Sequence, residues 1–186
     1  PHLGQTQLEH LLQDYLNIRH IIWLDQGLVG DETDGHIDNI ACFARPGEVI
    51  LAWTENPTHP QYAVVQAADV ALRAARDAAG RTLRIHHLPL PEPMFVTASE
   101  AAGVHPSTTA IPRPANAPLT ASYVNFYLTN GGVVFPLFDQ AQADQQALQT
   151  LRTIFPERKL IGVPSRELLL GGGNIHCLTQ QQPLGR

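Results

Sequence analysis

The stretch Asn39-Ile-Ala-Cys-Phe-Ala-Arg-Pro-Gly-Glu-Val-Ile-Leu-Ala-Trp53 contains two apolar runs on either side of a Pro-Gly turn. The first run belongs to a strand predicted over residues 37–43, and the second predicts a strand over 48–53. An alanine-rich segment at 60–79 then predicts a helix closed by a glycine, a residue typical of helix C-termini. A third apolar run predicts a strand at 83–88. The whole segment therefore reads as one ββαβ unit.

The same order of elements occurs a second time, which identifies an internal repeat. Asn125-Phe-Tyr-Leu-Thr129 matches Asn39-Ile-Ala-Cys-Phe43, and Asn174-Ile-His-Cys-Leu178 begins a third unit. The complete units are predicted at about 36–90 and 121–164. The second complete unit has predicted strands at 122–128, 133–138 and 159–163 and a helix at 141–154. The partial unit before the first consists of a helix at 5–17 and a strand at 20–24, and the partial unit at the end begins with a strand at 175–179.

The predicted fold class is therefore α/β, built from ββαβ units that must stack or close into a ring to bury their faces. Two complete units and two partial ones would leave open faces, and residue 1 is not methionine. We therefore expect residues 1–186 to be part of a longer protein. A proline-rich segment at 89–118 separates the units and is predicted to be a long loop with a functional role.

Composition excludes several classes of protein. The 186 residues are 44% hydrophobic and 16% charged, with a net charge of −5, so a core can be buried and no basic surface for nucleic acid is expected. No apolar run approaches the ~20 residues of a membrane-spanning helix. The two cysteines lie far apart and form no disulfide pattern, which favours a cytoplasmic location. Exposed strand edges suggest a homo-oligomer.

Acidic residues concentrate in Gly30-Asp-Glu-Thr-Asp-Gly-His-Ile-Asp-Asn39, which holds four acids and one histidine. If this stretch enters a strand, His36 and Asp38 point to the same face because they are two residues apart. A histidine beside a carboxylate can transfer protons or contribute to a metal site. Asp34 is a further candidate for binding substrate. The alternative is a solvated acidic loop.

Three glycines in Gly171-Gly-Gly-Asn-Ile-His-Cys177 allow the backbone to approach a ligand, and they precede a candidate nucleophile, Cys177. In a strand, His176 would face away from the group that Cys177 attacks, so His36 is the better predicted partner. Gly172 and Asn174 are candidates for binding substrate. The matching places of Asn39, Asn125 and Asn174 in the repeats predict that the unit starts converge.

The sequence gives less support to a metal site or to a nucleotide cofactor. His36, Asp38, His176 and Cys177 are donor types that zinc accepts, but no CxxC, HxxxH or HExxH spacing occurs, so no metal is expected. No GxGxxG or P-loop pattern occurs, so no nucleotide cofactor is expected. Cys42 lies in an apolar strand and is predicted to be structural, as is the pair at 86–87.

The sequence resembles the agmatine deiminases, which belong with the bacterial-type peptidylarginine deiminases in the guanidine-modifying superfamily. The resemblance rests on three motifs that occur in the family's order along nearly the whole chain: 30–39, Ala121-Ser-Tyr-Val-Asn-Phe-Tyr-Leu-Thr-Asn-Gly-Gly-Val-Val134 and Gly171-Gly-Gly-Asn-Ile-His-Cys-Leu-Thr-Gln-Gln-Gln-Pro183. It implies a five-bladed α/β propeller of the pentein type, of which this chain is about the C-terminal half.

The resemblance also implies an activity: hydrolysis of agmatine, a small cationic guanidinium compound, to N-carbamoylputrescine and ammonia without cofactor or metal. Cys177 matches the family's nucleophile, His36 its general acid/base, and Asp38 a carboxylate that holds the guanidinium. Two alternatives stay open. The substrate could be arginine in peptides, or the chain could be an inactive fragment that serves as an assembly or binding module.

Overall fold

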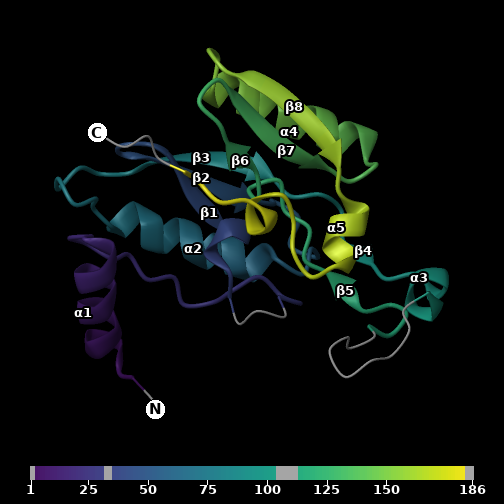
Figure 1. Cartoon of the computed structure of the whole chain (residues 1–186), viewed down its shortest axis with the longest axis horizontal. Coiled ribbons are helices and arrows are strands. Elements are labelled where there is room, and N and C mark those ends of the chain that lie inside the picture. Colours follow the sequence, from purple (N-terminus) through teal and green to yellow (C-terminus); the bar gives the residue numbers. More distant parts are fainter. Residues whose placement is uncertain (1–2, 32–34, 104–112, 183–186) are drawn as a thin grey trace.

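The computed structural model describes residues 3–31, 35–103 and 113–182, and its body consists of two three-stranded sheets that each carry a helix (Figure 1). In each sheet the first two strands are antiparallel and the last two are parallel, in the order in which they occur along the chain. The first sheet consists of β1 (Ala41–Arg45), β2 (Glu48–Trp53) and β3 (Arg84–Pro89), with α2 (Tyr62–Ala74) between β2 and β3; the second consists of β6 (Tyr127–Leu128), β7 (Gly132–Leu137) and β8 (Lys159–Pro164), with α4 (Ala141–Ile154) between β7 and β8.

The apolar runs form the central strands because both of their faces are covered. Residues 49–52 of β2 are all buried, and Val133 and Phe135 of β7 are buried as well. Such unbroken runs are typical of parallel strands covered on both sides. The helix α4 contacts β3 as well as β8, so it packs between the two sheets and joins them. Its buried residues Ala147 and Leu151 lie one turn apart, as an amphipathic helix requires.

The fold class predicted from the repeat is confirmed: the chain is α/β and both units have ββαβ order. The bounds of the helices differ at two places. The first helix is α1 (Gln5–Leu16), and it ends where Asn17 takes the left-handed conformation with φ 52°. The helix predicted at 60–79 ends at Ala74, because Asp77 accepts the backbone N–H groups of Ala79 and Arg81 and turns the chain early.

The strands predicted at the three unit starts, over 37–43, 122–128 and 175–179, are wrong over part or all of their length, and of the first only residues 41–43 lie in β1. Residues 37–39 and His176–Leu178 form the short 3-10 helices η1 (Ile37–Asn39) and η2 (His176–Leu178), and the predicted strand at 122–128 shrinks to β6. At these places short polar side chains bind nearby backbone N–H groups instead of leaving them to a strand partner: Ser122 accepts from Val124, and Asn174 accepts from Ile175. Residues 20–24 form no strand, since no ladder joins them to any strand in the described ranges.

The proline-rich segment contains regular secondary structure in its described parts, 89–103 and 113–118, whereas residues 104–112 lie outside the described residues. Its ends pair as the antiparallel strands β4 (Met94–Phe95) and β5 (Pro118–Leu119), and α3 (Ala98–Ala102) follows β4. Thr97 and Glu100 form a capping box that fixes the start of α3. After the second sheet, α5 (Arg166–Leu170) leads the chain to the glycine-rich stretch. Within the described residues no helix is long and apolar enough to cross a bilayer.

Candidate active site

The acidic stretch supplies one side of the site. His36 precedes η1, and its backbone N–H donates to Asp31 Oδ2 over 2.7 Å. Asp38 lies inside η1, and its Oδ1 is 3.9 Å from His36 Nδ1. His36 and Asp38 are therefore neighbours, as predicted, but a 3-10 turn brings the two groups together and not the alternation of a strand. Asp34 lies outside the described residues.

The cysteine lies opposite this turn, 139 residues further along the chain. Cys177 is exposed in η2, and its Sγ donates to Asp38 Oδ2 over 3.3 Å. His176 Nδ1 lies 2.8 Å from the same oxygen. The expectation that His176 faces away from the site of Cys177 is therefore wrong, because consecutive residues of a 3-10 helix do not alternate between two faces. The Asp38 carboxylate therefore contacts both Cys177 and His176, which are adjacent in the sequence.

Buried amides connect the unit starts beneath the cysteine. Asn125 Nδ2 donates to Asn39 Oδ1 over 3.0 Å and lies 3.3 Å from Cys177 Sγ. Asn125 Oδ1 accepts the backbone N–H of His176 over 2.8 Å. Asn174 is 1% exposed, and its Nδ2 is buried with no hydrogen-bond partner among the described residues. The predicted convergence of the unit starts is thus present in the contacts of Asn39, Asn125 and η2.

The proline-rich segment holds the helix that precedes the cysteine. Arg166, the first residue of α5, donates through Nε and Nη2 to the two carboxylate oxygens of Glu100 over 2.7 and 2.9 Å. This hydrogen-bonded pair, with the help of backbone donors, lowers the pKa of Glu100 to about 2. At the other end of α5, Arg113 Nη1 donates to the carbonyl oxygens of Leu169 and Leu170 over 2.7 and 3.0 Å. Both ends of α5 are therefore tied to segment 89–118.

Two glycines after α5 are required by space and backbone conformation. Gly172 has φ +94°, and a Cβ there would lie 3.2 Å from Arg113 Nη2. A Cβ on Gly173 would lie 2.9 Å from the Cβ of Cys177, which is closer than real side chains approach. Gly172, a predicted substrate contact, lies against Arg113 and lines a small hollow with Asp31 and Asn39.

The charges of the site favour a small cation. Donor atoms of His36, Asp38 and Cys177 lie within 4.8 Å of one another. A metal ion fits such spacing, but Asp38 Oδ2 is already shared by Cys177 and His176, whereas Oδ1 is buried with no hydrogen-bond partner among the described residues. A buried carboxylate oxygen without a donor is costly, and a planar cation with N–H groups would satisfy it. That no metal ion takes part stays a prediction.

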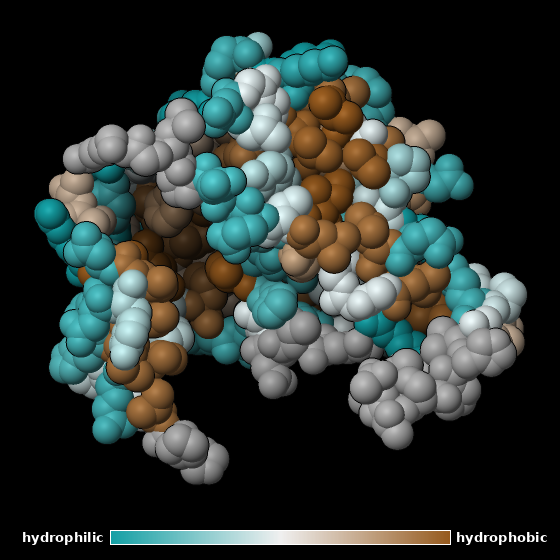
Figure 2. Space-filling view, viewed as in Figure 1, coloured by the Kyte–Doolittle hydropathy of each residue, from teal (hydrophilic) through white to brown (hydrophobic). Residues whose placement is uncertain are grey.

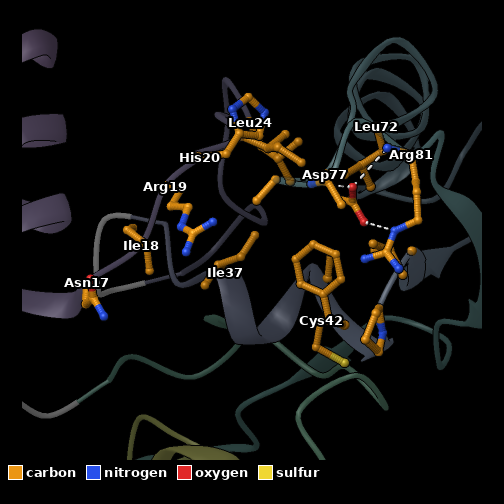
Figure 3. A pocket seen from close by; sticks show the side chains of 18 residues that line it. Asn17, Ile18, Arg19, His20, Leu24, Ile37, Cys42, Leu72, Asp77 and Arg81 are labelled. Carbon is orange, nitrogen blue, oxygen red and sulfur yellow. Dashed lines mark hydrogen bonds and ion pairs between the residues drawn. The ribbon is translucent and has the colours of Figure 1, made fainter.

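A larger hollow lies elsewhere in the molecule. It has a volume of about 630 Å³ and opens between residues 17–24, the start of β1 and the turn after α2. Figure 2 shows it as a brown, hollowed surface beside α1, and Figure 3 shows Cys42 in its wall with Ile37 nearby. Burial raises the pKa of the Cys42 thiol to about 12. This agrees with the predicted structural role of Cys42.

The structure brings three residues to the site that the sequence did not single out for it. Asn125 occupies a repeat position, which predicts that it lies near the other unit starts, but the pattern does not predict a contact of its side chain with Cys177. Gly173 is one of three glycines that look equivalent in sequence, and the proline-rich composition around Arg113 hides its role. The equal spacing of Asn39 and Asn125 before their strands is the one usable signal.

Known proteins share both this sequence and this fold. A model of the Porphyromonas-type peptidyl-arginine deiminase family matches residues 1–183. A curated protein of Shewanella sp. (strain MR-4), provisionally named agmatine deiminase, is 55% identical over 186 residues, which are all of this chain and 50% of that protein. The chain therefore spans about half the length of the curated relatives it matches.

Solved structures also match nearly all of this chain over about half of their own length. The agmatine deiminase of Enterococcus faecalis, described as catalysing its reaction, has a TM-score of 0.91 at 39% identity over 97% of this chain and 49% of its own. A Cys-to-Ser variant of the C. jejuni agmatine deiminase with substrate bound has a TM-score of 0.75 at 26% identity, over 94% of this chain and 45% of its own. These neighbours bear out the predicted fold, in which ββαβ units build a propeller of the pentein type.

Proposed function

The chain belongs to the Porphyromonas-type peptidyl-arginine deiminase family, and from this premise we propose that the protein containing it hydrolyses agmatine to N-carbamoylputrescine and ammonia. The names of the relatives support agmatine as the substrate. The observation that carries the proposal is the position of Asp38, which contacts Cys177 and His176 through one oxygen. Its other oxygen is buried with no hydrogen-bond partner in the described part of the chain.

Binding begins with the guanidinium group of the substrate. Asp38 Oδ1 accepts its N–H groups, and the paired charges hold the planar group with its carbon near Cys177. The cation also offsets the negative charge of Asp38 beside the sulfur, which favours the thiolate. The thiol proton passes to His36, whose imidazole belongs to the same cluster.

The covalent step then balances within the site. The Cys177 thiolate attacks the guanidinium carbon, a carbon–sulfur bond forms, and a carbon–nitrogen bond breaks as His36 protonates the departing ammonia. A thiouronium remains on the sulfur. His36, now neutral, removes one proton from water, and the oxygen attacks the carbon. The second proton of that water passes to solvent as the carbonyl forms, and the thiolate leaves with release of the ureido product.

Asn174 and Gly172 complete the proposed lining, with Asp34 as a further contact to substrate. Within the same proposal the protein is cytoplasmic, forms a homo-oligomer, and binds no nucleic acid. The competing substrate is arginine within peptides, and the competing role is that of an inactive assembly module.

The test is a colorimetric assay for ureido product with agmatine and, separately, with an arginine-containing peptide. The chain is expressed alone and within its complete reading frame. Asp38→Asn is expected to lower kcat/KM for agmatine by about 100-fold or more, since a charge-assisted contact is lost. The exposed Asp14→Asn variant on α1 is the matched control and should keep full activity.

Three outcomes contradict parts of the proposal. Turnover of the peptide but not of agmatine would move the assignment to peptidyl-arginine. Equal activity of the Asp38→Asn variant and the wild type would remove Asp38 from substrate binding. No ureido product from either substrate, with the complete reading frame expressed and folded, would favour the inactive module.

A further inference from the structure

We infer that Asn125 is a positioning residue that holds the Cys177 segment in place and stabilises the negatively charged form of its sulfur. The inference rests on the proposed function, because it takes Cys177 as the nucleophile. Asn125 comes from the start of the second ββαβ unit, so the inference gives that unit a part in the site.

Both the oxygen and the nitrogen of the Asn125 carboxamide form hydrogen bonds. Its Oδ1 accepts the backbone N–H of His176 over 2.8 Å, at the first residue of η2. Its Nδ2 donates to Asn39 Oδ1 over 3.0 Å and approaches Cys177 Sγ to 3.3 Å. A single side chain thus contacts η2, the residue at the end of η1, and the sulfur.

The orientation of this amide follows from its partners. A backbone N–H can only donate, so the end of the carboxamide that faces His176 must be the oxygen. The end closer to Cys177 Sγ is then the NH₂ group, which has two hydrogens and lies at 3.3 Å, against 3.7 Å for Oδ1, which can accept from the protonated thiol. One hydrogen serves Asn39, and the second is available to the sulfur. Asn125 is 0% exposed, and hydrogen bonds are strongest where water is excluded.

The Asn125 NH₂ group matters because of the charges that surround the sulfur of Cys177. The ionisable groups of the described residues that face Cys177 are Asp38, whose Oδ2 lies 3.3 Å from Sγ, His36 in the same cluster, and His176 through Asp38. A thiolate beside the Asp38 carboxylate places two negative charges close together, and these charges repel each other. A hydrogen bond from Asn125 Nδ2 to the sulfur opposes that effect.

Asn125→Asp separates this role from a purely structural one. The carboxylate has the same shape and keeps an oxygen that accepts from His176, so η2 stays anchored. The other oxygen replaces the donor beside the sulfur with an acceptor that carries charge. Asn39 can turn its own amide to donate to the new oxygen. A purely structural role predicts a less stable protein whose alkylation midpoint is unchanged while it is folded, whereas thiolate stabilisation predicts a large shift of that midpoint.

The measurement is the rate at which iodoacetamide alkylates Cys177 as a function of pH, followed by peptide mass spectrometry on the protein from its complete reading frame. Only the thiolate reacts, so the midpoint of the profile reports its formation. Asn125→Asp is expected to move the midpoint upward by about one pH unit or more, which makes alkylation about tenfold slower at pH values below the midpoint. Asn130→Asp, an exposed turn residue, is the matched control and should leave the midpoint in place.

Far-ultraviolet circular dichroism and a urea unfolding curve report whether the variant is folded. An unshifted midpoint in a folded variant overturns the inference. If the variant is not folded, the wild-type protein labelled with ¹⁵N-asparagine decides instead. The side-chain amide signals of Asn125 should then titrate with the midpoint of Cys177 alkylation, and their failure to move would overturn the inference.

Alkylation needs no substrate, so this test separates the inference from the proposed function. A shifted midpoint without any turnover of agmatine would leave the role of Asn125 standing and remove the deiminase. Turnover of agmatine with an unshifted midpoint would support the deiminase activity and overturn the proposed role of Asn125.

Discussion

Cys42 and Cys177 occupy the same place in two repeats, three residues after Asn39 and Asn174, and yet they have opposite surroundings. Cys42 lies in β1 opposite Ile50, and burial raises the pKa of its thiol to about 12. Cys177 lies exposed in η2 and contacts Asp38 and Asn125. The repeat therefore places a thiol at a unit start, and the local backbone decides whether it can react.

The difference arises from the backbone on the C-terminal side of each asparagine. After Asn39 the chain joins β1, whose ladder with β2 is lined by apolar residues, so the cysteine side chain is packed against the sheet. After Asn174 the chain makes a 3-10 turn, and Gly173 leaves the room in which the cysteine lies. Cys177 is exposed because the chain forms a 3-10 turn here in place of a strand, so backbone conformation separates the two cysteines more than residue type does.

The largest effect expected from this contrast is on turnover. Cys177→Ala should lower kcat for agmatine by about four orders of magnitude or more, because the covalent step is lost. Cys42→Ala should stay within a few-fold of wild type, since Cys42 packs within the first sheet and lines the hollow away from η2. The ureido assay measures both. Loss of activity in a folded Cys42→Ala variant would show that the two cysteines are not divided in this way.

A smaller effect is expected from Gly173→Ala. The added Cβ would lie 2.9 Å from that of Cys177 and must displace the cysteine, and a shift of about 1 Å can cost about 100-fold in kcat/KM. Gly131→Ala is the control, because a Cβ there meets nothing within 4 Å. Steady-state kinetics of the two variants are compared with the wild type. If both variants were equally active, Cys177 would not depend on the space that Gly173 leaves.

The smallest effect concerns stability at alkaline pH. The pKa of Cys42 is about 12 in the folded protein and 9.0 as an ordinary thiol, so folding favours its protonated form. This contribution is fully present below about pH 9 and is lost as the pH rises through about 12. The free energy of unfolding of the wild type should therefore fall more steeply across that window than that of Cys42→Ala. Urea titrations at several pH values test this, and parallel pH profiles would argue that Cys42 is not desolvated in the folded state.

Much of the fold could be predicted because its strands and helices carry the usual periodic patterns. The helix at 141–154 has the predicted bounds, and the central strand at 48–53 does as well. The unit starts could not be predicted, because an apolar residue such as Ile37 or Ile175 suits a strand as well as a 3-10 turn. Which of the two forms depends on whether a partner strand lies alongside, and a local pattern does not contain that information.

The candidate site was predicted in part for a similar reason. The acids at 31–38 and Cys177 stand out by composition, and the repeat together with the family resemblance is enough to pair His36 and Asp38 with the cysteine. Asn125 could not be placed beside the sulfur, since it is a common residue in an apolar stretch. His176 was excluded on a ground that holds only in a strand. The general lesson is that residue type reveals ionisable groups, whereas the neutral groups that tune them are found only in three dimensions.

The network around Asn125 also has a consequence for how the protein folds. Its contacts join residues 86 and 52 positions apart in the chain, and the contact of Asp38 with the cysteine spans 139 positions. Closing loops of such length costs entropy, and it slows folding relative to local structure. The sulfur should consequently acquire its partners only after both sheets have formed. A chain that is still incomplete would lack these contacts, so the candidate site would form as one of the last steps of folding.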